Sequence, residues 1–240
     1  LDLVDPDEPF SVADFARHAR AVLADVAARD GVALLVGGTG LYLRAIARGI
    51  DTEALPSDPA LRTDLEAELA RSGAAHMVER LRATAPILAA DTDLANPRRV
   101  VRALEIAGIV GDGPRPRPRG YGGPLAWLGL ALPDAEHRRR IGARAQAQFD
   151  AGLLEEARSL RARFDPNLPA FSAIGYREAW DVLDGATTLD EAIALDAARN
   201  VAFARRQRTW FRSEPDIAWL DAGEDPLAPA TRLVEGLLER

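Results

Sequence analysis

The chain has no cysteine and no lysine among its 240 residues, and it has only three histidines. Without cysteine, disulfide bonds, thiol nucleophiles and cysteine-based zinc sites are excluded. His18, His76 and His137 lie far apart and show no metal-ligand spacing, so any metal would need oxygen ligands. Without lysine, the phosphate-binding Walker loop GxxxxGK[ST] is absent from these residues.

Long hydrophobic runs are also lacking. The longest apolar stretches have the length of a β-strand, so we expect neither a membrane-spanning helix nor an export signal. The hydrophobic content of 48% is enough for a core, and the net charge of −7 argues against a surface that binds nucleic acid throughout. A local basic patch is compatible with that charge. We therefore expect a cytoplasmic protein of one large or two modest domains.

A glycine-rich turn at residues 37–40 is the feature around which the predicted fold is organised. The apolar run at residues 32–36 predicts a buried parallel strand, and the spacing of residues 41–48 predicts a helix. In open α/β sheets, ligands bind where a strand feeds a helix, because backbone N–H groups point there. Thr39 adds a hydroxyl at this point. The alternative is that the glycines only permit a sharp turn.

The remaining apolar patterns indicate an α/β protein with a helical insertion. Residues 125–132 predict a second buried strand, and residues 217–220 predict a short third one. Residues 55–113 instead predict one helix after another. We therefore predict a P-loop NTPase-like core with a parallel sheet, formed by residues 1–54 and 114–240, and a helical insertion domain at residues 55–113.

Helix starts are marked clearly. Ser11 and Thr188 each begin a capping box, and the helix that follows Thr188 is expected to reach Arg212. Asp58 and Asn96 each precede a proline, which is typical of the first turn of a helix. A proline- and arginine-rich stretch at residues 111–120 predicts a loop.

Positive charge is concentrated at residues 205–212, in the last turns of the helix expected after Thr188. Three arginines of this stretch share one helix face, and Arg206 lies one turn from Trp210, a pairing that suits phosphates and bases. The three are Arg205, Arg208 and Arg212. The alternative is a set of arginines placed favourably near a helix C-terminus, with Trp210 and Phe211 in the core.

Two further arginine pairs lie where a bound anion would stabilise them. Arg98 and Arg99 follow Asn96 and Pro97 in a first helical turn, where the helix dipole makes arginine unfavourable by about 0.3–1 kcal/mol. Arg140 and Arg144 are four residues apart on one face, where like charges repel and a diphosphate would suit the pair. In both cases ordinary solvent exposure is the competing explanation.

The stretch from Ser172 to Glu178 combines small residues, a tyrosine and an arginine. Small residues permit close backbone approach, and Tyr176 with Arg177 would suit contact with a nucleotide. A buried tyrosine beside an exposed arginine would look the same. The carboxylates, Glu105 among them, show no pairing that marks a catalytic pair.

Six segments then occur in a characteristic order. They are DPDEPFSVADF at 5–15, LVGGTGLYL at 35–43, LPSDP at 55–59, NPRR with RALE at 96–105, GYRE at 175–178 and RQRTWF at 206–211. This series resembles the bacterial tRNA dimethylallyltransferase (tRNA isopentenyltransferase) family over nearly the whole chain.

The resemblance implies a reaction, a set of partners and a set of site residues. The reaction is transfer of a dimethylallyl group from dimethylallyl diphosphate to N6 of the adenine beside the tRNA anticodon, with Mg²⁺ and a monomeric enzyme. Thr39 would contact the target base, and Arg140 or Arg144 would hold the diphosphate. The residues along the tRNA path would be Thr39, Arg62, Asn96, Pro97, Arg98, Arg99, Val100, Ser172, Gly175, Tyr176, Arg177, Arg205, Arg206, Gln207, Arg208, Thr209, Trp210 and Arg212.

The chain departs from this family in one respect. The family begins with a strand, a Walker-type loop and an aspartate that takes the proton from N6, and the present sequence begins at Leu1 without them. We therefore expect an N-terminally truncated fragment that is weakly active or inactive and retains at most residual tRNA binding. The alternatives are a non-catalytic nucleic-acid-binding module and an adenylate isopentenyltransferase, although a free nucleotide would not need the helical block at residues 55–113.

Overall fold

The computed structural model describes residues 3–49, 57–114 and 119–239, and it divides into two compact units. The sheet unit comprises residues 1–15, 26–43 and 123–240, and the helical unit comprises residues 16–25 and 44–122. Residues 55–56 of the LPSDP segment and residues 115–118 of the predicted loop lie outside the described residues.

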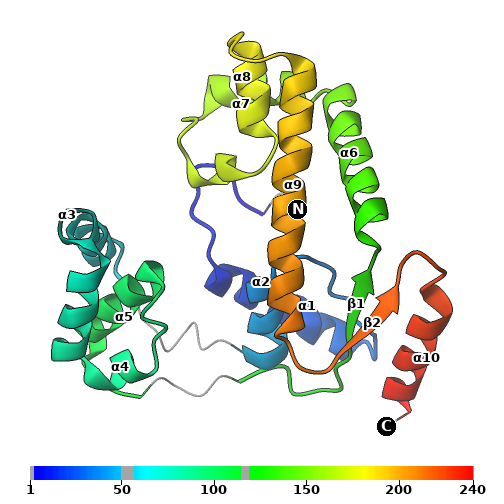
Figure 1. Cartoon of the computed structure of the whole chain (residues 1–240). Helices are drawn as coiled ribbons and strands as arrows, with labels where there is room; N and C mark the ends of the chain where they lie inside the picture. The colour runs from blue at the N-terminus through cyan, green and yellow to red at the C-terminus, as the bar shows by residue number, and fades with distance from the viewer. Residues whose placement is uncertain (1–2, 50–56, 115–118, 240) are drawn as a thin grey trace. The chain divides into compact units, whose positions relative to one another are not determined.

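The described part of the sheet unit contains one parallel pair of strands, β1 (Trp127–Ala131) and β2 (Ile217–Asp221). Trp127 lies opposite Ile217, and the pairing continues in register along both strands. Parallel neighbours require a long crossover. Here the crossover contains α6 (Asp134–Asp150), α7 (Leu153–Arg163), α8 (Tyr176–Leu183) and α9 (Leu189–Arg212) (Figure 1). The strands predicted from residues 125–132 and 217–220 are confirmed, as is the α/β class.

The burial predicted for two apolar runs is wrong. Residues 32–36 form no strand, and the side chains of Leu34 and Val36 are each 82% exposed. In β1 and β2, Leu130 is 65% exposed and Trp219 is 45% exposed. A strand is completed by neighbours that lie far away in the sequence. Among the described residues β1 and β2 pair only with each other, so residues 32–36 have no strand beside them.

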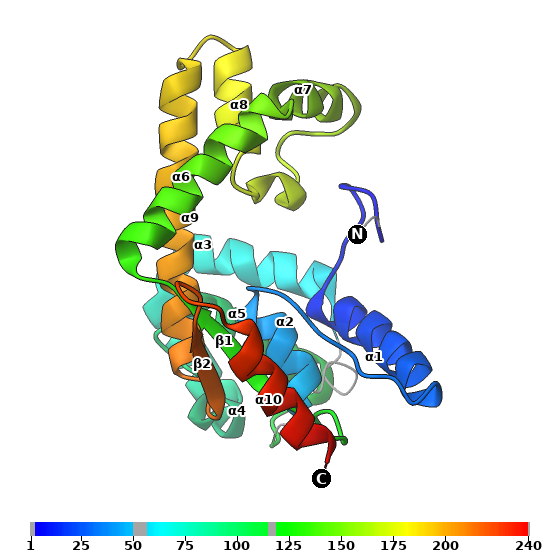
Figure 2. The same ribbon diagram turned by 90° about the vertical axis from the view of Figure 1, so that its right-hand side faces the viewer.

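Helices form most of the sheet unit (Figures 1 and 2). They are α2 (Gly40–Arg44), α6 (Asp134–Asp150), α7 (Leu153–Arg163), the short η2 (Pro169–Ser172), α8 (Tyr176–Leu183), α9 (Leu189–Arg212) and α10 (Leu227–Leu238). A buried cluster that includes Phe149, Phe171 and Trp180 joins α6, η2 and α8, and Trp180 donates its ring N–H to Ala157 O at 2.9 Å. This core fixes the helices that carry most of the predicted site residues.

The helical unit is built on α3 (Pro59–Thr84), α4 (Pro86–Ala90) and α5 (Pro97–Val110). Helix α3 bends at Gly73, whose φ of 80° lies in the left-handed region that favours glycine. The two arms of α3 and helix α5 enclose a core that includes Leu65, Met77, Leu81, Val100 and Leu104. The helical character predicted for this part of the chain is confirmed.

The predicted helix starts are confirmed. Ser11 and Thr188 form capping boxes at α1 (Val12–Ala28) and α9, and Asp58 and Asn96 accept backbone N–H groups at α3 and α5. The helix expected over residues 41–48 is α2 followed by one π-helical stretch, η1 (Ala45–Gly49).

Candidate nucleic-acid interface

The glycine loop packs directly on the last turns of α9. Gln207 donates its side-chain amide to Gly38 O at 3.0 Å. A Cβ on Gly40 would lie 2.1 Å from the Trp210 ring, so only glycine permits this approach. Neither Gly38 nor Gly40 has a positive φ. The glycines are therefore needed for close contact with α9, and the reading of them as a sharp turn alone does not describe this loop.

Thr39 lies at the point of this contact. Its carbonyl accepts the N–H groups of Tyr42 at 3.0 Å and Leu43 at 3.3 Å, so it begins α2. The residue is exposed, and its hydroxyl has no hydrogen-bond partner in the described part of the chain. Phe15 of α1 stacks on Tyr42 of α2 with ring centroids 4.7 Å apart, and this contact holds α2 against α1. The structure thus holds an exposed threonine between two glycines that contact Gln207 and Trp210 of α9.

The arginines of α9 differ in their surroundings. Arg208 binds Asp134 of α6 at 2.6 Å, while the guanidinium of Arg206 lies over the ring of Phe203, 5.6 Å from its centroid. The pairing of Arg206 with an aromatic ring therefore involves Phe203, on the turn before it. Arg205 forms no hydrogen bond or ion pair through its side chain with any described residue, and Thr209 Oγ1 donates to its backbone carbonyl at 3.0 Å.

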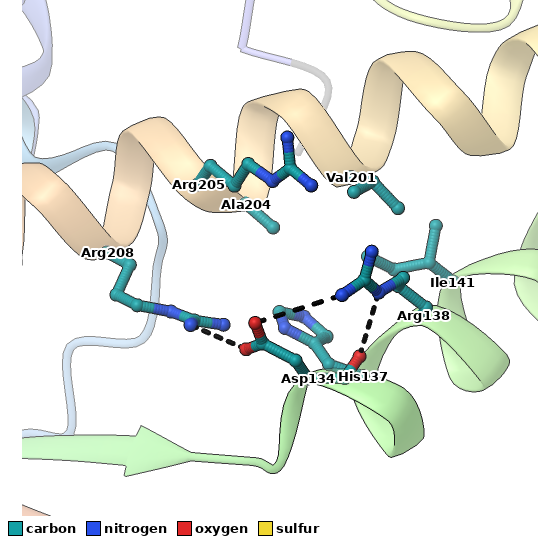
Figure 3. A pocket seen from close by; sticks show the side chains of 8 residues that line it. All are labelled: Asp134, His137, Arg138, Ile141, Val201, Ala204, Arg205 and Arg208. Atoms are coloured by element: carbon teal, nitrogen blue, oxygen red, sulfur yellow. Dashed lines mark hydrogen bonds and ion pairs between the residues drawn. The ribbon is translucent and has the colours of Figure 1, made fainter.

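A pocket lies between α6 and α9 (Figure 3). It is lined by Asp134, His137, Arg138 and Ile141 from α6 and by Val201, Ala204, Arg205 and Arg208 from α9. Arg138 approaches Asp134 at 3.9 Å and donates to its backbone carbonyl at 3.4 Å. The hydrogen bond from Arg208 and the nearby positive charges lower the pKa of Asp134. Asp134 and Arg138 are not among the predicted site residues, although their spacing of four residues is visible in the sequence.

The two arginines predicted to hold a diphosphate already lie near carboxylates. Arg140 donates to Glu136 at 2.7 Å, and hydrogen bonds from Arg139 and Arg140 lower the pKa of Glu136 to about 2. Arg144 is exposed and interacts electrostatically with buried Asp196. The repulsion between the pair is offset by these carboxylates, so the spacing alone does not require an anion.

The start of α8 is held by a buried charge cluster. Glu178 accepts the Gly175 N–H at 3.0 Å and pairs with Arg199 of α9. Asp196 is fully buried, and its Oδ2 has no hydrogen-bond partner among the described residues. Burial raises the pKa of Asp196, and the neighbouring Glu178 raises it further. Gly175 has a φ of 115°, which a side chain would strain.

Of the residues around Gly175, Tyr176 faces the core and Arg177 faces solvent. The Tyr176 hydroxyl donates to Glu156 at 2.7 Å, and burial together with this carboxylate raises the tyrosine pKa to about 12. The ring packs against Phe171 with centroids 5.7 Å apart. Ser172 donates to Pro169 O at 2.7 Å. The arrangement therefore matches the alternative of a packed tyrosine beside an exposed arginine.

In the helical unit, Arg62 is tied to a buried carboxylate. Its guanidinium donates to both oxygens of Glu105 and to Ser57 Oγ at 2.8–3.1 Å. Glu105 also accepts from Arg102 at 2.7 Å and from the Asp58 N–H at 2.9 Å. Burial alone would raise the pKa of Glu105, but these hydrogen bonds lower it overall. Arg62 therefore joins the start of α3 to α5.

The predicted site residues at the start of α5 have different roles. Asn96 caps the helix by accepting the Arg98 N–H at 3.2 Å, Pro97 occupies its first turn, and Val100 is 1% exposed in the core. Arg98 and Arg99 lie on the surface, where Arg99 is 3.6 Å from Asp93. Of the predicted site residues in this unit, Arg98 and Arg99 are exposed and Arg62 is partly exposed.

Among the described residues, none of the helices combines the length and the apolar character that crossing a membrane requires. No group of three or more His, Asp or Glu side chains in the same residues is placed to hold a metal ion.

Comparisons with known proteins agree on one family. A family model described as IPP transferase matches residues 1–214. A tRNA dimethylallyltransferase from Anaeromyxobacter sp. (strain K) is 45% identical over 98% of this chain and 78% of its own length, and one from Kineococcus radiotolerans is 42% identical over 98% and 75%. The crystal structure of a full-length tRNA isopentenylpyrophosphate transferase from Bacillus halodurans matches with a TM-score of 0.67 and 32% identity, covering all of this chain and 78% of that one.

Proposed function

The chain belongs to the IPP transferase family, and we propose that it transfers a dimethylallyl group from dimethylallyl diphosphate to N6 of the adenine beside the anticodon of a tRNA. The observation that supports this proposal best is the contact between the glycine loop and α9. It joins the two glycines that flank Thr39 to Gln207 and Trp210 of α9, whose last turns are rich in arginine. An RNA chain whose backbone follows these arginines would bring a base to Thr39.

The chemistry proposed is a direct displacement. N6 of the adenine attacks the allylic carbon, the bond between that carbon and the diphosphate oxygen breaks, and N6 loses a proton. Arg140 and Arg144 are proposed to stabilise the negative charge that grows on the leaving diphosphate. Arg140 would exchange its partner Glu136 for a phosphate oxygen, since an exposed ion pair of this kind is weak. The target base would leave its stack to reach the loop.

Two roles expected from the resemblance have no residue here to carry them. The 240 residues contain no lysine and hence no Walker-type loop, and no hydrogen bond joins the Thr39 side chain to a carboxylate among the described residues. Magnesium stays an expectation of the resemblance: the described residues offer no cluster of ligands for it, and no step above depends on it. The proposal includes a monomer that acts in the cytoplasm.

Radiolabelled prenyl transfer to an unmodified anticodon stem-loop tests this function. We expect little or no transfer by the 240-residue chain and measurable transfer when the chain is preceded by a segment that carries a Walker-type loop. Stem-loop binding without transfer by either version would favour a non-catalytic RNA-binding module. Transfer to free AMP with no transfer to RNA would contradict the proposed substrate.

A further inference from the structure

The pocket between α6 and α9 contains more positive than negative charge. Arg138, Arg205 and Arg208 line it, and the only carboxylate among its lining residues is Asp134 (Figure 3). Asp134 binds Arg208 at 2.6 Å and Arg138 at 3.9 Å, whereas the side chain of Arg205 has no hydrogen bond or ion pair with the described residues. Two guanidinium groups therefore share the one carboxylate, and the third has no acidic ion-pair partner among the described residues.

The rest of the lining carries no second carboxylate. Ile141 is buried, and it lines the pocket together with Val201, Ala204 and the ring of His137. A planar guanidinium presents donors in a fork that fits phosphate oxygens, so an anion entering the pocket would meet converging donors from two helices.

We propose that this pocket binds a phosphodiester group of the substrate RNA, and that Asp134 occupies the place of that phosphate when no RNA is bound. On binding, the phosphate takes Arg138, Arg205 and Arg208 as donors and Asp134 releases Arg208. This inference rests on the proposed function, because the RNA is its substrate. It adds Asp134 and Arg138 of α6 to a surface otherwise formed by α9.

The position of the pocket favours an RNA phosphate over a free diphosphate. Its side chains are open to solvent: Arg138 is 57% exposed and Asp134 is 59% exposed. It adjoins the glycine loop along α9, because Arg208 directly follows Gln207, whose amide binds Gly38. A phosphodiester backbone that passes over an open pocket reaches these groups from solvent, and the diphosphate already has Arg140 and Arg144 proposed for it.

The test compares charge changes inside the pocket with the same changes beside it on α6. Asp134→Asn removes the competing carboxylate, and Glu136→Gln removes a carboxylate from the same turn that pairs with Arg139 and Arg140 instead. For the anticodon stem-loop we expect Asp134→Asn to raise affinity about 2–5-fold above Glu136→Gln, the range expected for an exposed ion pair.

Removing an arginine from the pocket should have the opposite effect on RNA affinity. Arg138→Gln should lower affinity several-fold and reduce the slope of log K against log salt by about 0.7 to 0.9, the contribution of one phosphate. Arg139→Gln is the matched control, since Arg139 is 71% exposed and pairs with Glu136 outside the pocket. It should leave the slope unchanged. Thermal melting of each variant confirms that the fold is intact.

The outcomes separate this inference from the proposed function. RNA binding that responds to these variants, with no transfer even when a segment that carries a Walker-type loop precedes the chain, supports the pocket and removes the function. The pocket is overturned, and the function is not, if Asp134→Asn and Glu136→Gln give the same RNA affinity. The same holds if Arg138→Gln and Arg139→Gln give the same affinity and salt slope. The inference is also overturned if the unaltered chain binds no stem-loop. It is overturned as well if inorganic pyrophosphate competes with RNA only when Arg138 is present, because pyrophosphate is then the occupant of the pocket.

Discussion

Substituting Gly40 by alanine tests the contact between the glycine loop and α9. The new Cβ would lie 2.1–2.4 Å from three atoms of the Trp210 ring, a rigid group that cannot swing aside like the end of a long side chain. Overpacking of this kind costs about 1–3 kcal/mol, and replacing glycine at a helix start returns up to about 1 kcal/mol. We therefore expect a net loss of about 1–2 kcal/mol, with Thr39 displaced.

Two neighbouring glycines provide a graded control. A Cβ on Gly37 would meet only Leu43, at 3.8 Å, so Gly37→Ala should be neutral or slightly stabilising. A Cβ on Gly38 would meet the amide end of Gln207, which can move away at the cost of one hydrogen bond, about 0.5–1.5 kcal/mol. The expected order of destabilisation is Gly40, then Gly38, then Gly37.

Urea unfolding and stem-loop binding measure the effect. Gly40→Ala should weaken RNA binding about tenfold, because a contact worth about 1.4 kcal/mol changes a dissociation constant by that factor. In a double-mutant cycle, Trp210→Leu makes room for the new methyl group, so the two changes should couple by about 1 kcal/mol. Equal behaviour of Gly40→Ala and Gly37→Ala, or no coupling with Trp210, would refute the contact as described.

Three further predictions concern buried or paired groups. Glu105→Ala leaves Arg62 and Arg102 without their shared partner and should destabilise the helical unit by about 3 kcal/mol in urea unfolding. Because the pKa of Glu105 lies below its ordinary value of 4.5, its contribution should hold above pH 4.5 and disappear as the pH falls through the lower, folded-state pKa, a loss that Glu105→Gln should not show. Asp196 should behave oppositely: its pKa is raised above 3.8, so it favours the folded state only at low pH, and Asp196→Asn should gain stability relative to the unaltered chain as pH rises from 3.8. Tyr176→Phe should lower stability by about 1 kcal/mol through loss of the Glu156 bond and leave RNA affinity unchanged, whereas Arg177→Ala should weaken binding without altering the melt.

Local signals in the sequence predicted local structure well. Ser11, Thr188, Asp58 and Asn96 lie within three residues of the N–H groups that they cap, so each helix start could be identified from a short stretch. The run at residues 32–36 was misassigned because a strand depends on partners that no short stretch contains. The burial of β1 and β2 was misjudged for a similar reason, because the exposure of a strand depends on the elements that pack against its faces.

The candidate site was predictable as a set of segments and less so as individual side chains. The contact of the glycine loop with α9 joins residues 169 positions apart, and no local pattern specifies it. Arg62 binds a carboxylate 43 positions away, and Tyr176 binds one 20 positions away, so both are occupied in a way that composition does not show. The spacing of Arg140 and Arg144 suggested a bound anion, but Glu136 lies one turn before Arg140 and already pairs with it.

The most direct test of the account is a photocrosslink from the RNA. An anticodon stem-loop that carries 8-azidoadenosine at the adenine beside the anticodon is bound to the unaltered chain, irradiated and digested, and the attached peptide is identified by mass spectrometry. Because Thr39 is proposed to contact the target adenine, and its loop packs on α9, we expect the RNA to attach within residues 37–44 or 205–212. Attachment confined to other parts of the chain would contradict it.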